Sequence, residues 1–362
     1  MTKIAISAAE TSGDLIGSTL VQALKAQDSN LQIEGLCGDK MQQAGCQKRW
    51  DMSLVNVMGF TEVLKKLPSL FKLRAEIVSY FSDQQPDVFI GVDAPDFNFI
   101  IEKKLKKQGV KTIHFVSPSV WAWRQSRVKK IKQSTDLLLC LFPFEVNFYK
   151  QCGQRAVFVG HPLAEKLSPR KNHISSKQIL LMPGSRSGEV KRLLPELLAA
   201  AVIMSKQDSD LSFHLALANE ELLNWAIELV GDQQLEISID EAHIRMQSAD
   251  LVLVASGTAA LELALVGVPM VVVYKLSAMS YFIASRLIKS KYISLPNVIA
   301  DKALVPELIQ DDANAQNIAN QAMIILSSDQ KEIIAEFGNI HQQLSLNASE
   351  ESARLVLEFI NE

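Results

Sequence analysis

Cysteine is scarce in this sequence of 362 residues. Four cysteines are present, and no two of them form a C-x-x-C pair: Cys37, Cys46, Cys140 and Cys152. Their number excludes a disulfide framework, and their spacing gives no zinc-binding or redox motif. We therefore expect reduced and mostly buried thiols, as in cytoplasmic proteins.

The sequence also lacks a hydrophobic run long enough for a signal peptide or a membrane span. The first apolar stretch, residues 4–9, ends at Glu10 and is too short for a signal-peptide core. The longest apolar region, residues 251–276, is interrupted by Glu262, Gly267 and Pro269. It predicts a strand, a helix and a second strand, so we expect a cytoplasmic protein without a transmembrane helix.

Neither sign of charge is in excess, since 37 Lys and Arg stand against 40 Asp and Glu. This balance argues against attraction of nucleic acid over the whole surface, so no nucleic-acid partner is predicted and any basic site must be local. Hydrophobic residues make up 48% of the chain and charged residues 21%, the composition of a globular protein. At roughly 150 residues per domain, the length predicts about two domains.

Short β-branched runs, each followed by turn residues and a longer helical pattern, recur along the chain. This alternation is typical of βαβ units with a parallel sheet. The polar residues 168–177 separate two such series and predict a linker. The expected strands are residues 3–8, 32–36, 87–92, 111–116, 136–141 and 156–159 before it, and 178–182, 211–217, 235–239, 250–254 and 269–274 after it.

We predict an α/β protein with two doubly wound, Rossmann-like domains, residues 1–167 and 178–312, and a helical C-terminal segment, residues 313–362. Doubly wound sheets bind ligands at the carboxyl ends of their strands, so the two domains are expected to share a ligand-binding cleft. The C-terminal segment has an apolar face that must dock on another surface.

Candidate ligand-binding residues follow two expected strands of the first domain. The sequence ETSGD turns directly into an apolar helix, so its amides suit a phosphate or a sugar hydroxyl, with helix capping as the alternative. Asp93 stands at the tip of strand 87–92, where a carboxylate is either a general base or a turn residue before Pro95. The candidates in ETSGD are Glu10, Ser12, Gly13 and Asp14.

Aromatic and cationic residues gather after strand 111–116, in the sequence VSPSVWAWR. Trp121 and Arg124 are three residues apart, so on a helix they would share a face that suits an anionic or sugar ligand. Core packing of the tryptophans is the alternative. His161 lies near the expected cleft by topology, although an ordinary loop histidine explains it equally well.

Two glycine-containing turns in the second domain suit a nucleotide. In PGSRSGE, Gly184 allows close approach of the backbone and Arg186 can hold two phosphate oxygens, unless it is a plain surface arginine. In SGTAALE, Glu262 can accept both hydroxyls of a ribose, unless it caps the helix. The expected nucleotide-binding residues are Gly184, Ser185, Arg186, Ser256, Gly257, Thr258 and Glu262.

One pattern typical of metal binding is present but is not expected to hold a metal. Asp208 and Asp210 form a D-x-D pair, but they precede strand 211–217 and so lie at the amino edge of the sheet, away from the expected cleft. No other carboxylate or histidine cluster has metal-ligand spacing, so neither a metal nor another cofactor is predicted.

The apolar residues of segment 60–73 fall at helical spacing, with Lys65, Lys66, Lys72 and Arg74 among or beside them. Such a segment either rests on an anionic membrane surface or packs its apolar face into the core. The residues that would contact a membrane are Val63, Leu64, Leu67, Leu70 and Phe71.

Together these motifs resemble the lipid-A-disaccharide synthases, inverting glycosyltransferases with the two-domain GT-B fold. The resemblance covers essentially the whole chain, and GVDAPDFN and VSPSVWAWR are its most specific parts. It implies that UDP-2,3-diacylglucosamine is the donor and 2,3-diacylglucosamine 1-phosphate the acceptor. The implied products are the β-1,6-linked disaccharide 1-phosphate and UDP.

The resemblance also implies residue roles and partners. Asp93 would deprotonate the acceptor 6-hydroxyl, Arg186 would neutralise charge on the departing UDP, and Asn297 would join Glu262 in the nucleotide site. The family exchanges its C-terminal part between two protomers, which implies a homodimer. Because both substrates carry acyl chains, a peripheral location on the inner membrane is implied, and this favours membrane contact by segment 60–73.

Two other functions stay open. A UDP-sugar epimerase on the same fold would use the same nucleotide half but would need no acceptor hydroxyl and no lipid surface. The VSPSVWAWR segment argues against it. A nucleotide-sugar-binding regulatory module without catalysis is the other alternative.

Overall fold

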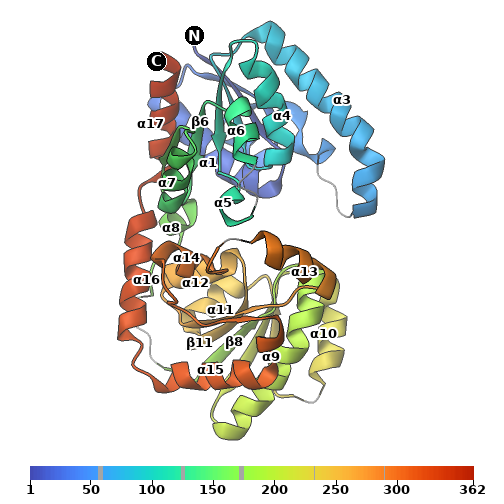
Figure 1. Ribbon diagram of the computed structural model, residues 1–362, viewed down its shortest axis with the longest axis vertical. Helices are drawn as coiled ribbons and strands as arrows, with labels where there is room; N and C mark the ends of the chain where they lie inside the picture. The colour runs from blue at the N-terminus through green and yellow to red at the C-terminus, as the bar shows by residue number, and fades with distance from the viewer. Residues whose placement is uncertain (56–59, 124–126, 171–174, 232, 289) are drawn as a thin grey trace. The chain divides into compact units, whose positions relative to one another are not determined.

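The chain forms two compact units, which we call unit 1 (Met1–Glu165 with Leu344–Glu362) and unit 2 (Lys166–Gln343). The computed structural model describes residues 1–362 except 56–59, 124–126, 171–174, 232 and 289, and the side chains of residues 60–66, 122–123 and 283–284 are also outside the description. Each unit contains one parallel sheet between helices (Figure 1). The predicted pair of doubly wound α/β domains is thereby confirmed.

Unit 1 contains a seven-stranded sheet with the order β3-β2-β1-β4-β5-β6-β7. The strands are β1 (Lys3–Ala8), β2 (Gln32–Cys37), β3 (Gln47–Asp51), β4 (Val88–Val92), β5 (Lys111–Phe115), β6 (Leu137–Cys140) and β7 (Ala156–Phe158). The helices are α1 (Thr11–Gln27), α2 (Asp39–Gln43), α3 (Phe60–Gln84), α4 (Pro95–Lys106), α5 (Val120–Trp123), α6 (Val128–Ser134), α7 (Pro143–Gln151), α8 (Pro162–Lys166) and α17 (Ala348–Asn361), with a 3-10 turn at Met52–Leu54.

The two faces of this sheet are covered by different helices because its strands are apolar on both sides. On one face, Ile4 and Ile6 of β1 pack with Leu20 of α1 and Val356 of α17. The other face carries Phe89 of β4 against side chains of α3 and α4: Leu73, Ile77, Phe81, Phe97 and Ile101.

Unit 2 contains a six-stranded sheet with the order β10-β9-β8-β11-β12-β13. The strands are β8 (Gln178–Met182), β9 (Ser212–Leu217), β10 (Glu236–Ile239), β11 (Leu251–Ala255), β12 (Met270–Tyr274) and β13 (Glu307–Ile309). The helices are α9 (Ser187–Gln207), α10 (Leu223–Val230), α11 (Ala242–Ser248), α12 (Thr258–Val266), α13 (Ala278–Leu287), α14 (Leu295–Ala300), α15 (Ala315–Ser327) and α16 (Lys331–Leu344), with 3-10 turns at Glu220–Leu222 and Gln310–Asp312.

The helical segment 313–362 divides between the units: α15 and nearly all of α16 belong to unit 2, and α17 belongs to unit 1. The apolar face of α17 is covered within this one chain, since Ala353, Val356 and Phe359 are buried with α1. Gly160 allows the returning chain to pass, because a Cβ at Gly160 would lie 3.0 Å from the Leu344 carbonyl oxygen.

The polar stretch 168–177 is already attached to unit 2 on both sides of its undescribed residues. The Arg170 amide donates to the Val266 carbonyl at 2.9 Å, and the Ser176 amide donates to Asp250 Oδ2 at 3.0 Å. The boundary of the units lies before this stretch, between Glu165 and Lys166.

Each sheet has a point at which the strand order reverses, and there the loops on the two sides separate and leave room for a ligand. In unit 1 this point lies between β1 and β4, with Ala8 paired to Val92 at the carboxyl ends. In unit 2 it lies between β8 and β11, with Met182 paired to Val254. The motifs expected to bind ligands follow these four strands.

Candidate active site

Asp93 and Ser12 meet at the carboxyl edge of the sheet in unit 1. Ser12 Oγ donates a hydrogen bond of 3.0 Å to Asp93 Oδ2. Gly13 permits this approach, because a Cβ there would lie 3.1 Å from the Val92 carbonyl oxygen and 3.6 Å from Asp93 Cβ. The loops after β1 and β4, 80 residues apart in the chain, thus form one site around a half-buried carboxylate.

The backbone at Asp93 is strained, since Asp93 and Ala94 have φ values of 53° and 42°. A left-handed backbone conformation costs of order 1 kcal/mol or more at a non-glycine residue, and such residues cluster at functional sites. The buried Asn98 side chain secures the loop: its amide nitrogen donates to the Asp93 carbonyl at 2.9 Å, and its oxygen accepts from Ser7 Oγ at 2.7 Å. Asp93 is therefore held in one orientation rather than left on a free loop.

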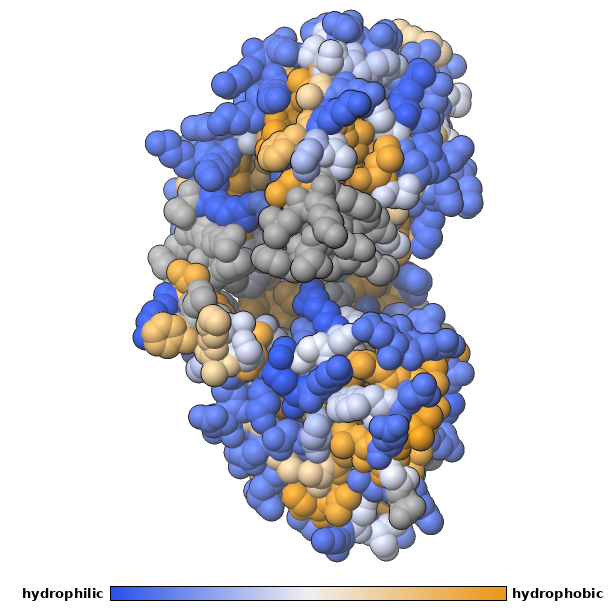
Figure 2. Space-filling model, turned by 90° about the vertical axis from the view of Figure 1, so that its right-hand side faces the viewer, coloured by the Kyte–Doolittle hydropathy of each residue, from blue (hydrophilic) through white to orange (hydrophobic). Residues whose placement is uncertain are grey.

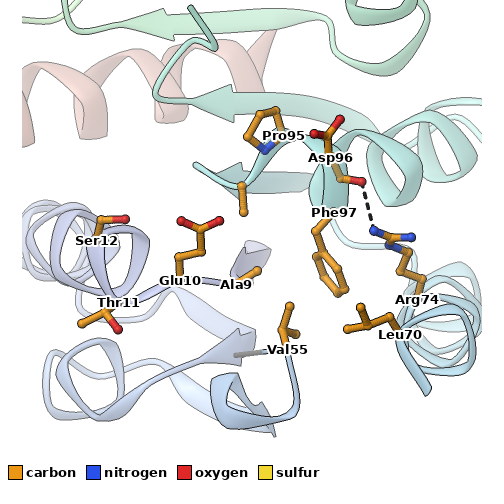
Figure 3. Close-up of a pocket in the computed structure, with 11 residues that line it drawn as sticks. Ala9, Glu10, Thr11, Ser12, Val55, Leu70, Arg74, Pro95, Asp96 and Phe97 are labelled. Carbon is orange, nitrogen blue, oxygen red and sulfur yellow. Dashed lines mark hydrogen bonds between the residues drawn. The ribbon is translucent and has the colours of Figure 1, made fainter. Parts of the chain in front are cut away.

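A cavity of about 640 Å³ opens beside this pair, with Glu10 and Ser12 in its wall (Figure 3). The pKa of Glu10 is raised, first by loss of solvation and second by the negative charge of Asp93. The remaining wall residues come mainly from α3 and from the first turn of α4 with its cap: Ala9, Thr11, Val55, Leu70, Arg74, Ala94, Pro95, Asp96 and Phe97.

Asp14, predicted to contact the ligand, has another role in the structure. It is buried, and its carboxylate accepts hydrogen bonds from the backbone amides of Gly38, Lys40 and Met41 at 2.8, 3.1 and 3.2 Å. These amides form the amino end of α2, whose unpaired N–H groups need an acceptor. Asp14 thus fixes α2 against α1, and it does not line the cavity.

Trp121 and His161 belong to a row of aromatic rings in unit 1. Trp121 packs edge-to-face on Phe144 at 4.7 Å, Phe144 stacks on Phe142 at 5.5 Å, and Phe142 contacts His161 at 5.2 Å. Burial lowers the pKa of His161 to about 4, so the ring is neutral at physiological pH, with Nδ1 accepting from the Leu163 amide. Arg124 lies outside the described residues.

In segment 60–73 the structure separates the predicted membrane residues. Phe71 is 59% exposed, whereas Leu70 is half-buried, packs against the core and lines the cavity. Leu70 therefore faces the protein, because it lies on the side of α3 that covers the sheet. Figure 2 faces the side of unit 1 that carries α3 and shows hydrophobic side chains among polar ones. Leu67 is partly exposed, and the side chains of Val63 and Leu64 are outside the description.

The glycine turns of unit 2 form a second pocket, of about 310 Å³, at the carboxyl ends of β8 and β11. Gly184 has a φ of 111° and leaves no room for a side chain, since a Cβ would lie 2.9 Å from Glu189 Oε2. Six of the predicted nucleotide-binding residues line the pocket: Gly184, Ser185, Arg186, Ser256, Gly257 and Thr258.

Arg186 directly precedes α9 and is the cation of this pocket that points into solvent. Its side chain is 83% exposed and donates one hydrogen bond of 3.3 Å to Glu189 Oε1. Exposed ion pairs contribute about 0–1 kcal/mol, so the guanidinium can turn to a phosphate at little cost. The amino end of α9 supplies unpaired N–H groups to the same anion.

Glu262 lies next to this pocket rather than in its wall. Its carboxylate is largely buried, and Oε2 lies 3.8 Å from Nδ1 of His243, which does line the pocket. Burial raises the pKa of Glu262, and the nearby His243 and Lys166 oppose that shift. His243 is a site residue that the sequence analysis missed, because a lone histidine at the start of a short helix carries no spacing signal.

Asn297, expected in the nucleotide site, is buried and uses its amide within its own loop. Its nitrogen donates to the Val305 carbonyl and to Glu307 Oε1 at 2.9 and 2.8 Å, and its oxygen accepts from the amides of Leu304 and Val305, both at 2.8 Å. Two donors and two acceptor positions are thereby filled. In this structure Asn297 has no hydrogen-bonding capacity left for a nucleotide.

A lysine side chain contacts both carboxylates of the D-x-D pair. Lys177 Nζ lies 2.9 Å from Asp208 Oδ2 and 3.0 Å from Asp210 Oδ2, at the amino edge of the sheet. The ammonium group holds the place that a divalent cation would take between these carboxylates.

The family model described as lipid-A-disaccharide synthetase matches residues 4–359. Curated relatives include the lipid-A-disaccharide synthases of Photobacterium profundum and Haemophilus ducreyi, which are 40% and 42% identical to this chain. Each alignment covers 99% of this chain, with 98% of the first relative and 97% of the second. The chain belongs to the lipid-A-disaccharide synthase family.

Solved structures of other proteins share the fold of this lipid-A-disaccharide synthase family member. A UDP co-structure of S. aureus MnaA has a TM-score of 0.66 at 15% identity, covering 100% of this chain and 97% of that chain. The calicheamicin glycosyltransferase CalG4 has a TM-score of 0.63 at 14% identity, covering 100% and 99%. These identities show the fold alone, and the fold is GT-B as the sequence predicted.

Two groups of buried polar residues pack against the family motifs and were not anticipated. His114 Nδ1 lies 2.7 Å from Glu102 Oε1, and neither residue is exposed. Gly91 in GVDAPDFN leaves the space for this pair, since a Cβ there would lie 2.1 Å from Glu102 Oε1. Among the described residues, Glu102 Oε2 and His114 Nε2 have no hydrogen-bond partner.

The second group surrounds Glu145, which is 2% exposed. Ser117 Oγ and the Phe142 amide donate to its carboxylate at 2.9 and 3.2 Å, and the Trp121 side chain also hydrogen bonds to it. Loss of solvation raises the pKa of Glu145 to about 8. This carboxyl joins α7 to the VSPSVWAWR segment, a contact between residues too far apart in the chain for a local pattern to reveal.

Proposed function

We propose that this chain transfers 2,3-diacylglucosamine from UDP-2,3-diacylglucosamine to 2,3-diacylglucosamine 1-phosphate, the reaction expected of a lipid-A-disaccharide synthase. The observation that carries the proposal is about 40% identity to curated lipid-A-disaccharide synthases over 99% of the chain. Chemically, a new β-1,6 bond forms between the donor anomeric carbon and the acceptor 6-oxygen. The bond from that carbon to UDP breaks, and UDP leaves with the electron pair.

Asp93 is the general base in this proposal. Its carboxylate takes the proton of the acceptor 6-hydroxyl as that oxygen attacks, which raises the nucleophilicity of the oxygen without a covalent intermediate. The strained loop and the hydrogen bond from Ser12 support this role, because they fix one carboxylate orientation. A single displacement of this kind inverts the anomeric centre.

Arg186 and the amino end of α9 bind the diphosphate in this proposal. Charge accumulates on UDP as the anomeric bond breaks, and a guanidinium with aligned backbone N–H groups stabilises that charge. Glu262 accepts the ribose hydroxyls next to the pocket. In this proposal the reaction needs neither a metal nor another cofactor, and the ion pairs of Lys177 with Asp208 and Asp210 support the absence of a metal at the D-x-D pair.

Arg186→Ala is expected to weaken UDP binding and turnover together, by roughly ten- to a hundredfold, because one charge-assisted contact contributes about 1.5–3 kcal/mol. Isothermal titration with UDP and steady-state kinetics measure the two effects. Arg192→Ala, nearly two turns further along α9 and outside the pocket wall, serves as the control. Unchanged UDP affinity in Arg186→Ala would remove this residue from the diphosphate site.

The epimerase alternative is favoured by fold alone: UDP-GlcNAc 2-epimerase from Neisseria meningitidis has a TM-score of 0.65 but 11% identity, covering 100% of each chain. Incubation with both lipid substrates separates the functions. We expect UDP release that depends on the acceptor, together with a disaccharide, in the presence of excess EDTA. An epimerised UDP-sugar supports the alternative, no turnover supports a binding module, and a strict requirement for Mg²⁺ overturns the metal-free mechanism.

We also propose peripheral contact with an anionic inner-membrane surface through α3. No helix within the described ranges is both long and apolar enough to cross a bilayer. Phe71 is exposed on α3, and Lys72 follows it. Insertion of such a side chain, together with nearby cations, gives reversible binding.

Phe71→Ser is expected to reduce binding to anionic vesicles by roughly ten- to a hundredfold, since burying a Phe side chain contributes about 1.5–3 kcal/mol. Co-sedimentation with vesicles measures this, and UDP affinity should not change. Ile324→Ser is the matched control, because Ile324 is also 59% exposed but lies on α15 of unit 2. Equal losses in both variants would mean that the effect is not specific to α3.

The homodimer with exchanged C-terminal segments stays a prediction. Its physical basis is that α17 reaches unit 1 by a single crossing at Gln343–Leu344, so a second copy could supply the same contacts. Light scattering on the purified protein tests the oligomeric state.

A further inference from the structure

The 640 Å³ cavity of unit 1 has a cationic end that the mechanism above does not use. Arg74 projects from α3 into its wall, across from Glu10 (Figure 3). Apolar side chains from three segments, Val55, Leu70 and Phe97, lie between these two charged groups. The cavity is therefore amphipathic, with opposite charges at its two ends.

Arg74 is poorly compensated for a charged side chain. Within the described part of the chain it makes one hydrogen bond, from Nη2 to the Asp96 carbonyl at 3.0 Å, and its buried Nε has no partner. The Asp96 carboxylate is paired with Arg127, and its charge offsets only part of the effect of lost solvation on the pKa of Arg74. A guanidinium carries five N–H donors, so most of the donor capacity of Arg74 is open to a ligand.

The surroundings of Arg74 favour an anion over water. Its guanidinium lies 4.8 Å from the centre of the Phe97 ring and 5.8 Å from that of Phe71. Loss of solvation in this setting lowers the pKa of Arg74. A bound anion would restore the lost electrostatic stabilisation, and a phosphate matches the fork geometry of the guanidinium.

We infer that this cavity binds the acceptor lipid, with the phosphomonoester held by Arg74 and the start of an acyl chain against Val55, Leu70 and Phe97. The inference rests on the proposed function and extends it to the acceptor site. A sugar phosphate with attached acyl chains presents an anion and apolar groups side by side, as the wall of the cavity requires.

The position of the reacting groups is consistent with this orientation. Ser12 and Ala94 line the cavity, and they are respectively the hydrogen-bond donor to Asp93 and its neighbour in sequence. With the phosphate at Arg74, the hydroxyl side of the sugar points towards Glu10, Ser12 and Asp93. Repulsion between Glu10 and the phosphate disfavours the reversed orientation. Arg74 is thus a specificity-determining residue, distinct from the base.

The test compares two acceptors, 2,3-diacylglucosamine 1-phosphate and the same lipid without its phosphate. For the natural chain we expect a clear preference in kcat/KM for the phosphorylated acceptor. Arg74→Gln should reduce that preference at least about tenfold, with an unchanged KM for the UDP-sugar, and Arg74→Lys should restore part of it. Lys104→Gln, at an exposed cation of the neighbouring helix α4 outside the cavity, should keep the full preference.

A binding measurement separates failure of this inference from failure of the proposed function. Titration of each acceptor without donor should show tighter binding of the phosphorylated lipid. In Arg74→Gln the ratio of the two affinities should be at least about tenfold smaller. If folded Arg74→Gln keeps the preference of the natural chain, or if folded Arg74→Lys restores none of the preference lost in Arg74→Gln, the inference is overturned even if disaccharide is formed. Failure of the natural chain to release UDP with either acceptor refutes the proposed function, while the binding result still decides the role of Arg74.

Discussion

Asp93→Asn is expected to lower turnover by about a hundredfold or more while UDP affinity stays nearly unchanged. The amide keeps the size of the carboxylate and can still accept the hydrogen bond from Ser12 Oγ. It cannot take the proton of the acceptor hydroxyl. Because the nucleotide pocket is built from β8 and β11 of unit 2, a change at the end of β4 should leave it intact.

Asp96→Asn provides the matched control within the same motif. Asp96 lies three residues further on, is exposed, and has its carboxylate paired with Arg127. We expect its turnover to fall by no more than a few-fold. Rapid-quench measurement of disaccharide formation at saturating substrates compares the two variants. If Asp93→Asn retains turnover close to that of Asp96→Asn, Asp93 is not the base.

The sequence predicted the site best where the candidate functional residues come directly after a strand with a clear apolar pattern. Buried strands such as β4 and β8 are almost wholly apolar, so their ends, and the residues just after them, could be located. Parallel sheets place these ends at one edge, which brings Asp93 to Ser12 and Gly184 to Ser256. Strand β3, with the sequence QKRWD, was missed because it is polar and lies at the edge of the sheet. Strand β13 (ELI) was missed because it is short and begins with a charged residue, whereas the equally short β7 (AVF) is wholly apolar and was predicted.

Side-chain roles were less predictable than positions. Asp14 and Asn297 were expected to bind ligands, yet the hydrogen-bonding groups of both side chains are occupied within the protein. The partners of Asp14 are amides 24 or more residues away, and the backbone partners of Asn297 lie in the loop that follows α14. A pattern shows which residue stands at a sheet edge but not which amides will face it. Arg74 shows the converse, since it was grouped with the surface cations of segment 60–73. Only the packing of α3 against α4 places it in the same cavity as Glu10.

We expect the natural chain to lose stability as pH rises through the range in which Glu145 titrates. Glu145→Gln is expected to abolish that loss. The pKa of Glu145 is about 8 in the folded chain because the carboxyl is buried, against about 4.3 when unfolded. Between these values the folded state binds more protons than the unfolded state, so the free energy of unfolding falls as pH rises. Glutamine does not titrate. Its one side-chain oxygen can accept from the Phe142 amide, and its amide nitrogen can donate to Ser117 Oγ, which then acts as acceptor.

His161 determines where this effect is best measured. Its pKa is about 4 in the folded chain and about 6.5 when unfolded, so between these values the unfolded state binds more protons and stability rises with pH. The contributions of His161 and Glu145 therefore oppose each other below about pH 6.5. Above it, the His161 contribution is complete and that of Glu145 remains.

The measurement is urea unfolding of the natural chain and of Glu145→Gln at several pH values from 6.5 to 8. The stability difference between them should change by up to about 2 kcal/mol over this range, at about 1.36 kcal/mol per pH unit. Other buried carboxyls are present in both proteins and cancel in the difference. Glu76→Gln, at an exposed position on α3, should show the pH dependence of the natural chain. A pH-independent difference for Glu145→Gln would mean that Glu145 is already ionised in the folded protein, its charge balanced by the hydrogen bonds that it accepts.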